Sequence, residues 1–216
     1  MDMTLLGIFF TVAFAHFLAL LSPGPDFVLL VKSAIKNGGK KSIGVAAGIA
    51  SANAVYISLC LIGVGSILAS SVAIMIALKI AGGLFLIYLA YMALKAKKTS
   101  YSDLAIVSVQ REKIVTTFKK EVFTGFMSGI LNPKNLLFYL SLFTVVLTGD
   151  VSFIFKFALG IWMTLMVFVW DVAIIYFLST NRVRAKFSKA AYYIDKITGA
   201  VLGLIGITIV KSALTK

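Results

Sequence analysis

Apolar residues along this chain gather into long charge-poor runs, and short polar or basic segments separate them. Each run is at least as long as the ~20 residues with which an α-helix crosses the hydrocarbon core of a bilayer. The runs cover residues 5–31, 43–69, 72–94, 122–147, 152–178 and 190–210. The pattern predicts an all-α integral membrane protein with six transmembrane helices.

Lysines and arginines concentrate in every second connection between the runs. The basic connections are residues 32–41, 95–121 and 179–189, whereas the connections near Ser70 and Gly149 contain no Lys or Arg. Because basic loops stay in the cytoplasm, the charge pattern predicts cytoplasmic basic connections and both termini outside.

Composition agrees with a membrane protein, since 60% of the 216 residues are hydrophobic and 13% are charged. The net charge of +13 would suggest nucleic acid in a soluble protein, but here the basic residues lie between apolar runs and act as topology signals. Cys60 is the single cysteine, so no intrachain disulfide is expected, and it reads as a small buried residue. Residues 1–4 contain no Lys or Arg, which favours a retained first helix over a signal peptide.

The two halves of the chain resemble each other in order. We expect a first three-helix unit at residues 1–98, a basic cytoplasmic linker at 99–121 and a second three-helix unit at 122–216. Ser22-Pro23 aligns with Asn132-Pro133, residues 45–49 with 157–161, and 79–82 with 196–199. An odd number of spans per half reverses the second half, so the expected fold is two inverted three-helix repeats. Coincidence among apolar helices is the alternative.

A break is expected in the first run at Leu21-Ser22-Pro23-Gly24-Pro25-Asp26. The two prolines lack amide donors, which frees the carbonyls of Ala19 and Leu21. Such a break is tolerable in a membrane only against protein or a wet cavity. The restarted helix offers amides to an anion and the freed carbonyls suit a cation, as a zwitterion requires. A packing kink is the alternative.

The fourth run carries a similar element at Asn132-Pro133-Lys134, where Pro133 frees the carbonyl of Gly129. Asn132 is expected to satisfy this backbone or to contact substrate. Lys134 lies deep in the run, where it either extends to the interface or pairs with Asp26 or Asp171.

Acids within apolar runs are the candidates for proton coupling. A carboxyl group in apolar surroundings can take up and release protons near neutral pH, which suits Asp171 and Asp26. Helix capping or interface solvation is the competing explanation. Asn53 and Tyr56 share a helix face and serve either interhelical bonding or substrate contact. His16 is expected to be a satisfied interior group, with a proton relay as the alternative.

Glycines recur within the runs, where they should let helices approach closely. They are Gly44, Gly48, Gly82, Gly83, Gly199 and Gly203.

The chain resembles the lysine exporter family, LysE/RhtB, in its proline-glycine-proline element at residues 21–25, its Asn132-Pro133-Lys134 element, its length and its basic central segment. The likeness covers nearly the whole chain. It implies a bacterial inner-membrane exporter of amino acids or their derivatives, driven by the proton motive force. Similar members handle lysine, arginine, threonine, homoserine or leucine, and some relatives move metal cations.

We therefore expect a secondary active exporter of neutral or basic amino acids, with the lipid bilayer and protons as partners and with no cofactor. The predicted substrate-binding residues are Ser22, Pro23, Gly24, Pro25, Asp26, Asn53, Asn132, Pro133 and Lys134. Asp171 and Asp26 are the predicted proton-coupling residues. The alternatives are a divalent cation exporter that uses both acids as ligands, and a membrane scaffold. An enzyme is not expected, because residue sets typical of metal-dependent or serine hydrolysis are missing. The formation of a homo-oligomer is left open.

Overall fold

The computed structural model describes residues 5–37, 39–64, 72–97, 116–146, 151–178 and 181–215. Within these ranges all regular structure is helical, which confirms the all-α prediction for the described part of the chain. Three helical segments are long and apolar enough to cross a membrane, at Gly39–Ile62, Phe153–Leu178 and Ala190–Leu214. A bent pair of helices, Leu5–Leu21 and Pro25–Asn37, makes a fourth candidate span.

The first predicted run is broken where its prolines indicate. Helix α1 (Leu5–Leu21) and helix α2 (Pro25–Asn37) meet at an angle of 56°. Residues 22–24 between them are not helical, and we call them the first break. Pro25 opens α2, a position where its missing amide costs no helical hydrogen bond.

The fourth run is divided in a similar way. Helix α7 (Phe118–Leu131) and helix α8 (Pro133–Val146) are separated by Asn132 alone, which we call the second break. Asn132 has extended backbone angles, φ −81° and ψ 105°, as expected for a residue that precedes proline.

The remaining helices are unbroken or nearly so. They are α3 (Gly39–Leu59), which continues into the π-helical segment η1 (Cys60–Val64), α5 (Val72–Lys95), α9 (Phe153–Leu178) and α10 (Asn181–Leu214). Cys60 is buried and free, as predicted.

Several helices extend beyond the apolar runs that predicted them. Helix α7 begins at Phe118 because the Thr117 hydroxyl accepts a hydrogen bond from the amide of Lys120 and caps the helix. Helix α10 begins at Asn181, within the basic connection. Apolarity marks what lies in the membrane, whereas Lys, Arg and Ala continue a helix into water. Most of the predicted linker, residues 99–115, lies outside the described residues.

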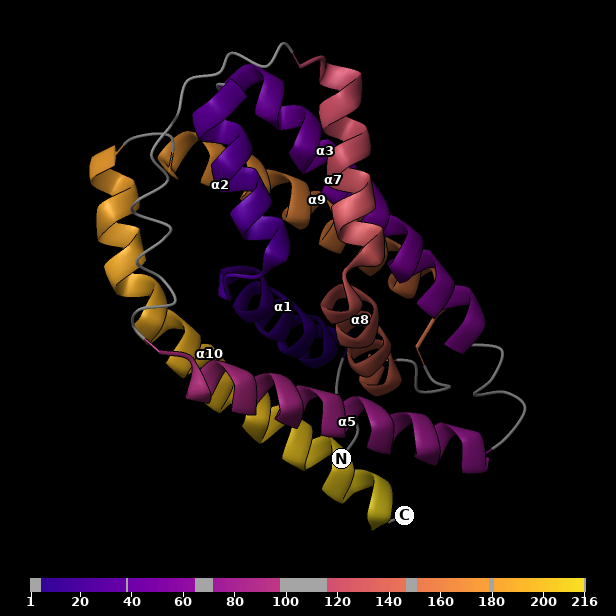
Figure 1. Cartoon of the computed structure of the whole chain (residues 1–216). Helices are drawn as coiled ribbons and strands as arrows, with labels where there is room; N and C mark the ends of the chain where they lie inside the picture. Colours follow the sequence, from indigo (N-terminus) through magenta and orange to yellow (C-terminus); the bar gives the residue numbers. More distant parts are fainter. Residues whose placement is uncertain are drawn as a thin grey trace.

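Close helix pairs bound the molecule on two sides (Figure 1): α3 packs along α7, and α5 along α10. A Cβ at Gly48 would lie 2.1 Å from the carbonyl oxygen of Val122 in α7, and one at Gly206 would lie 2.6 Å from that of Gly83. These contacts leave no room for a larger side chain. A Cβ added at any of the six predicted glycines would lie 3.1 Å or less from an atom of a neighbouring helix, which confirms that these glycines allow close helix packing.

Helices α1 and α8 lie between these two pairs in Figure 1, and α9 contacts α1, α2 and α3. Both breaks are thereby placed in the interior of the helical assembly.

Candidate functional site

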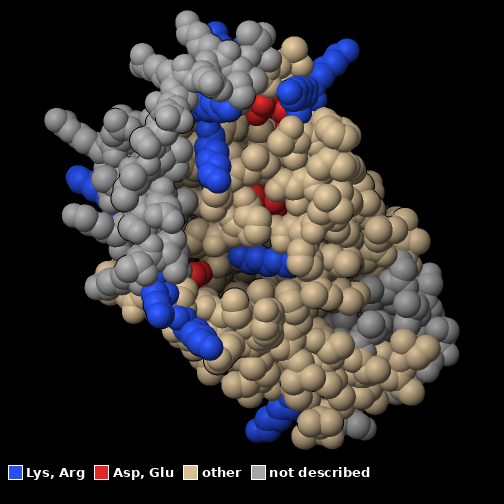
Figure 2. Space-filling view, in the orientation of Figure 1, with Lys and Arg blue, Asp and Glu red and all other residues tan. Residues whose placement is uncertain are grey.

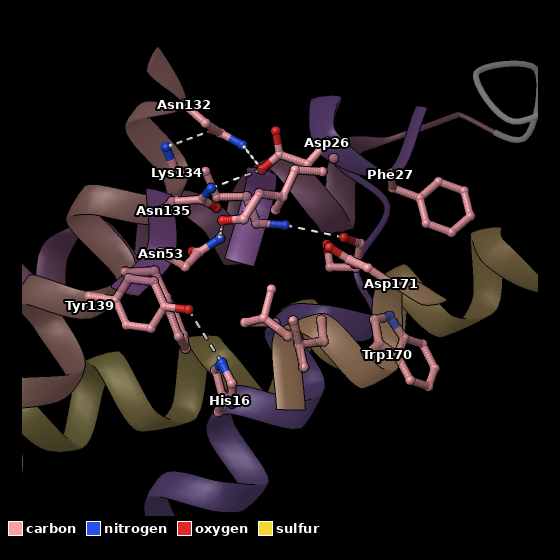
Figure 3. A pocket seen from close by; sticks show the side chains of 17 residues that line it. His16, Asp26, Phe27, Asn53, Asn132, Lys134, Asn135, Tyr139, Trp170 and Asp171 are labelled. Carbon is pink, nitrogen blue, oxygen red and sulfur yellow. Dashed lines mark hydrogen bonds between the residues drawn. The ribbon is translucent and has the colours of Figure 1, made fainter. Parts of the chain in front are cut away.

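The two breaks meet at a cavity of about 70 Å³ in the interior (Figure 3). Its walls come from α1, α2, α3, α9 and the α7–α8 region. Seven of the predicted site residues line it, namely Ser22, Gly24, Asp26, Asn53, Asn132, Lys134 and Asp171. The prolines stand apart: Pro23 and Pro25 line an adjacent groove, and Pro133 is exposed at the start of α8.

Asp26 is held by donors from the other half of the chain. One carboxylate oxygen accepts from the hydroxyl of Ser128 at 2.6 Å. The second accepts from the side-chain amides of Asn132 at 2.9 Å and Asn135 at 2.8 Å. Asp26 lies in the first turn of α2, and its carboxylate bonds three side chains of α7, the second break and α8, which ties the two breaks together. Figure 3 shows the bonds to Asn132 and Asn135.

The backbone groups at the second break are hydrogen-bonded by nearby residues of the same segment. The carbonyl of Gly129, which loses its helical donor at Pro133, accepts from the backbone amide of Asn132 at 3.3 Å and from the side chain of Asn135 at 3.3 Å. The Asn132 side-chain oxygen accepts from the amide of Lys134 at 3.0 Å, which caps α8. Of the two roles predicted for Asn132, backbone satisfaction is confirmed, and substrate contact stays a prediction.

The first break depends on side chains from distant helices. The ammonium group of Lys134 donates to the carbonyl of Ser22 at 3.2 Å, and the Ser22 hydroxyl donates to Asp195 of α10 at 2.7 Å. A Cβ at Gly24 would lie 3.6 Å from the Lys134 nitrogen. The pairing of Lys134 with Asp26 or Asp171 was one of two predictions; in the described residues the Lys134 ammonium donates its hydrogen bond to this backbone carbonyl instead.

Asp171 lies inside α9, which continues to Leu178, so it caps neither end of its helix. Its side chain is only 6% exposed and lines the cavity. One carboxylate oxygen, Oδ2, is buried and has no hydrogen-bond partner among the described residues. A buried carboxylate oxygen of this kind calls for a proton or a cation.

His16 contributes a second incompletely bonded group to the cavity wall. Its Nε2 lies 3.4 Å from the hydroxyl of Tyr139, and its buried Nδ1 has no partner in the described structure. The ring packs against those of Phe138, Tyr139 and Trp162. His16 is therefore buried as expected, but only one of its two ring nitrogens has a hydrogen-bond partner in the part of the chain that the structure describes, whereas a fully satisfied group was predicted.

The two polar residues of α3 that the sequence analysis singled out, Asn53 and Tyr56, bond in different ways. Tyr56 donates to the carbonyl of Ile130 in α7, an interhelical bond of the kind predicted. Asn53 donates to the carbonyl of Ile49 in its own helix at 2.8 Å, and it lines the cavity.

Comparison with known proteins assigns this arrangement to a family. Residues 17–213 match the sequence profile of the LysE type translocators, so the match includes both breaks and every residue that lines the cavity except His16. The chain belongs to the LysE type translocator family.

Relatives of the chain include proteins that are named for efflux and a membrane protein that is named as uncharacterized. This translocator is 25% identical over 209 residues to a "Threonine efflux protein" of Salmonella typhi, covering 96% of this chain and 100% of the relative. It is 25% identical over 210 residues to the "Threonine efflux protein" of Escherichia coli K12, with the same coverage. It is 28% identical over 191 residues to the "Uncharacterized membrane protein YrhP" of Bacillus subtilis, covering 86% of this chain and 90% of the relative. No solved structure matches the chain.

Three bonding partners of the translocator's breaks were missed by the sequence analysis. Ser128 and Asn135 flank the Asn-Pro-Lys element, but only the fold shows that they meet Asp26. Asp195 lies within the last apolar run, and the rule that selected Asp171 would have found it. Because Lys196 follows it, Asp195 reads in the sequence as a residue at the membrane–water interface.

Proposed function

We propose that this translocator exports amino acids, neutral or basic, across the bacterial inner membrane, and that the proton motive force drives the export. The observation that carries the proposal is the meeting of two helix breaks at a polar cavity inside an otherwise apolar helical protein. Broken helices present charges and backbone groups to a solute without a hydrated loop, as transporters require. The efflux function of the named relatives supports the same conclusion.

The cavity offers opposite charges to the two ends of a zwitterion. We assign the substrate carboxylate to the ammonium of Lys134, beside the first break, and the substrate ammonium to Asp171. Because a site of 10–15 Å³ can hold one water, the cavity of about 70 Å³ has room for roughly five waters. A small amino acid fits this space better than a peptide.

Asp171 provides a place where substrate and proton compete. Its buried oxygen is stabilised either by a bound proton or by the ammonium of the substrate. Mutually exclusive occupancy couples proton entry to solute exit in an antiporter. Asp26, whose two oxygens already accept three hydrogen bonds, is better suited to positioning the breaks than to carrying the proton.

The proposed membrane arrangement is six spans in two inverted three-helix repeats, with both termini outside. The breaks support it, because Ser22-Pro23 and Asn132-Pro133 align in sequence and both breaks meet at one cavity.

Counterflow measurements on purified protein in liposomes test the function. Vesicles loaded in turn with unlabelled threonine, homoserine, leucine, lysine or arginine should accumulate the corresponding labelled amino acid faster than protein-free vesicles. Lack of accelerated exchange for every amino acid, with circular dichroism showing a folded protein, would contradict the proposal.

A further inference from the structure

A second cavity of about 340 Å³ lies next to the central one, between the first break, α5 and α10. In Figure 2 the face of the molecule between α2 and α10 is hollowed, and acidic and basic side chains lie around the hollow. We call this second cavity the α10 groove. Leu89, Met92 and Leu202 form part of its apolar wall.

The polar wall of the groove comes from one face of α10. Asp195 and Thr198 are three residues apart, so their side chains project from the same face of the helix. Both are buried, with exposures of 6% and 1%, and both line the groove. The Thr198 hydroxyl has no hydrogen-bond partner among the described residues. A buried hydroxyl without a partner costs free energy, which a bound ligand would recover.

The groove and the central cavity share three residues, Ser22, Gly24 and Lys134. Ser22 also joins the charges on the two sides, because its carbonyl accepts from the Lys134 ammonium and its hydroxyl donates to the Asp195 carboxylate. An acidic and a basic side chain from different helices thus bond the same residue of the first break. Opposite charges of this kind can bind the two charged ends of an α-amino acid.

We propose that the α10 groove is a second binding site for the amino acid, occupied before the central cavity and reached from the cytoplasmic side. The substrate ammonium binds the carboxylate of Asp195 and the hydroxyl of Thr198, the carboxylate binds Lys134, and the substrate side chain lies against Leu89 and Met92. Since Lys134 serves both cavities, the substrate keeps this contact as its ammonium passes from Asp195 to Asp171. The inference rests on the proposed export function.

The position of the groove fits a cytoplasmic approach. It lies against the C-terminal half of α5, which ends at Lys95, and against α10 beyond its basic first turns. These basic segments are the ones that the charge pattern places in the cytoplasm.

The test measures uptake into inside-out membrane vesicles, in which the cytoplasmic face is exposed to the labelled substrate. The probes are labelled threonine, homoserine, leucine, lysine and arginine, each applied separately with an imposed pH gradient. Thr198→Val keeps the shape of the side chain and loses the hydroxyl, so KM should rise about tenfold with little change in maximal rate. Thr198→Ser retains the hydroxyl and should keep the wild-type KM. Asp195→Asn should raise KM by more than tenfold.

Thr208→Val is the matched control on the same helix, because the Thr208 hydroxyl is exposed and donates to the carbonyl of Leu204 in its own turn. It should leave KM unchanged. Wild-type uptake with an unchanged KM in Thr198→Val and Asp195→Asn would overturn the groove site and leave the export function intact. Absence of uptake by the folded wild-type protein for all five amino acids would overturn both proposals.

Discussion

The break before α8 is one residue long, and the carbonyl that Pro133 frees is bonded by Asn132 and Asn135 of the same segment. The break before α2 is three residues long; its Ser22 amide and Gly24 carbonyl bond within α1 and α2, but the Ser22 carbonyl and hydroxyl bond side chains of other helices. Asn132 and Asn135 satisfy the second break locally. The first break is bonded by Lys134 from α8 and by Asp195 from α10. A locally closed turn keeps its shape when neighbouring helices move, but a turn held by distant side chains changes with them.

This difference suggests that the two breaks have different roles in transport. Helix α7 is also fixed against α3 by the close approach of Gly48 and Gly125, which leaves little freedom for sliding. We infer that α3, α7 and the second break form a rigid platform, and that the first break is the part that rearranges during transport. The following substitutions test this contrast.

The double substitution Pro23→Ala and Pro25→Ala should have the largest effect on transport. It restores two backbone amides and lets α1 continue toward α2 as a regular helix, which removes the first break. Counterflow should fall at least 100-fold, while membrane insertion, followed by fractionation, stays at the wild-type level. Pro133→Ala is the matched control, and because Asn132 still caps α8, its loss should stay within about tenfold. Equal losses in the two variants would remove the distinction between the breaks.

Gly48→Ala should displace the platform itself. The new methyl group would lie 2.1 Å from the carbonyl oxygen of Val122, so α3 and α7 must separate. We expect a loss of about 3 kcal/mol in the free energy of unfolding, the upper part of the range for overpacked sites. Unfolding in detergent, followed by circular dichroism, measures it. At Gly203 the nearest contact of an added Cβ is the Ala90 Cβ at 3.1 Å, so Gly203→Ala should cost about 1 kcal/mol.

Asp171→Asn separates substrate binding from proton coupling, because Asp171 faces the cavity but belongs to neither break. The amide still accepts a hydrogen bond from a substrate ammonium but cannot carry a proton. Counterflow should fall by less than about tenfold, and the acceleration produced by an imposed pH gradient should disappear. A variant that retains the full response to the gradient would exclude Asp171 as the coupling group.

Asn132→Ala and Asn132→Ser divide the two roles of the second break. Alanine loses both the cap of α8 and the bond to Asp26, whereas serine can cap the helix but is too short to replace the amide. The cap alone should contribute about 1 kcal/mol, so the serine variant should unfold at a higher temperature than the alanine variant. Identical melting temperatures would show that the cap contributes nothing.

The sequence predicted both breaks because proline chemistry is local: Pro23, Pro25 and Pro133 interrupt helices in any fold. The glycines were predictable for a related reason, since a glycine among large apolar residues marks a close helix contact. The partners of the breaks could not be predicted. That Lys134 reaches the Ser22 carbonyl, and that Asn135 reaches Asp26, depends on how distant helices cross.

Some helices begin earlier than predicted, because an apolar run marks the membrane span and not the whole helix. The run that begins at residue 190 marks apolar surface, but α10 begins at Asn181, because charged residues continue a helix outside the hydrocarbon. The π-helical segment at Cys60–Val64 has no sequence signal that we recognise.

Lys134 joins the two breaks, since it lies in the first turn of α8 and bonds the first break, and its substitution is the most direct test. The measurement is equilibrium binding of the labelled amino acid with the fastest counterflow to purified Lys134→Met, with Lys156→Met of α9 as the control. Affinity should fall at least 100-fold in Lys134→Met, which loses the charge assigned to the substrate carboxylate, and should be unchanged in the control. Wild-type affinity in a folded Lys134→Met variant would show that the substrate does not bind where the breaks meet.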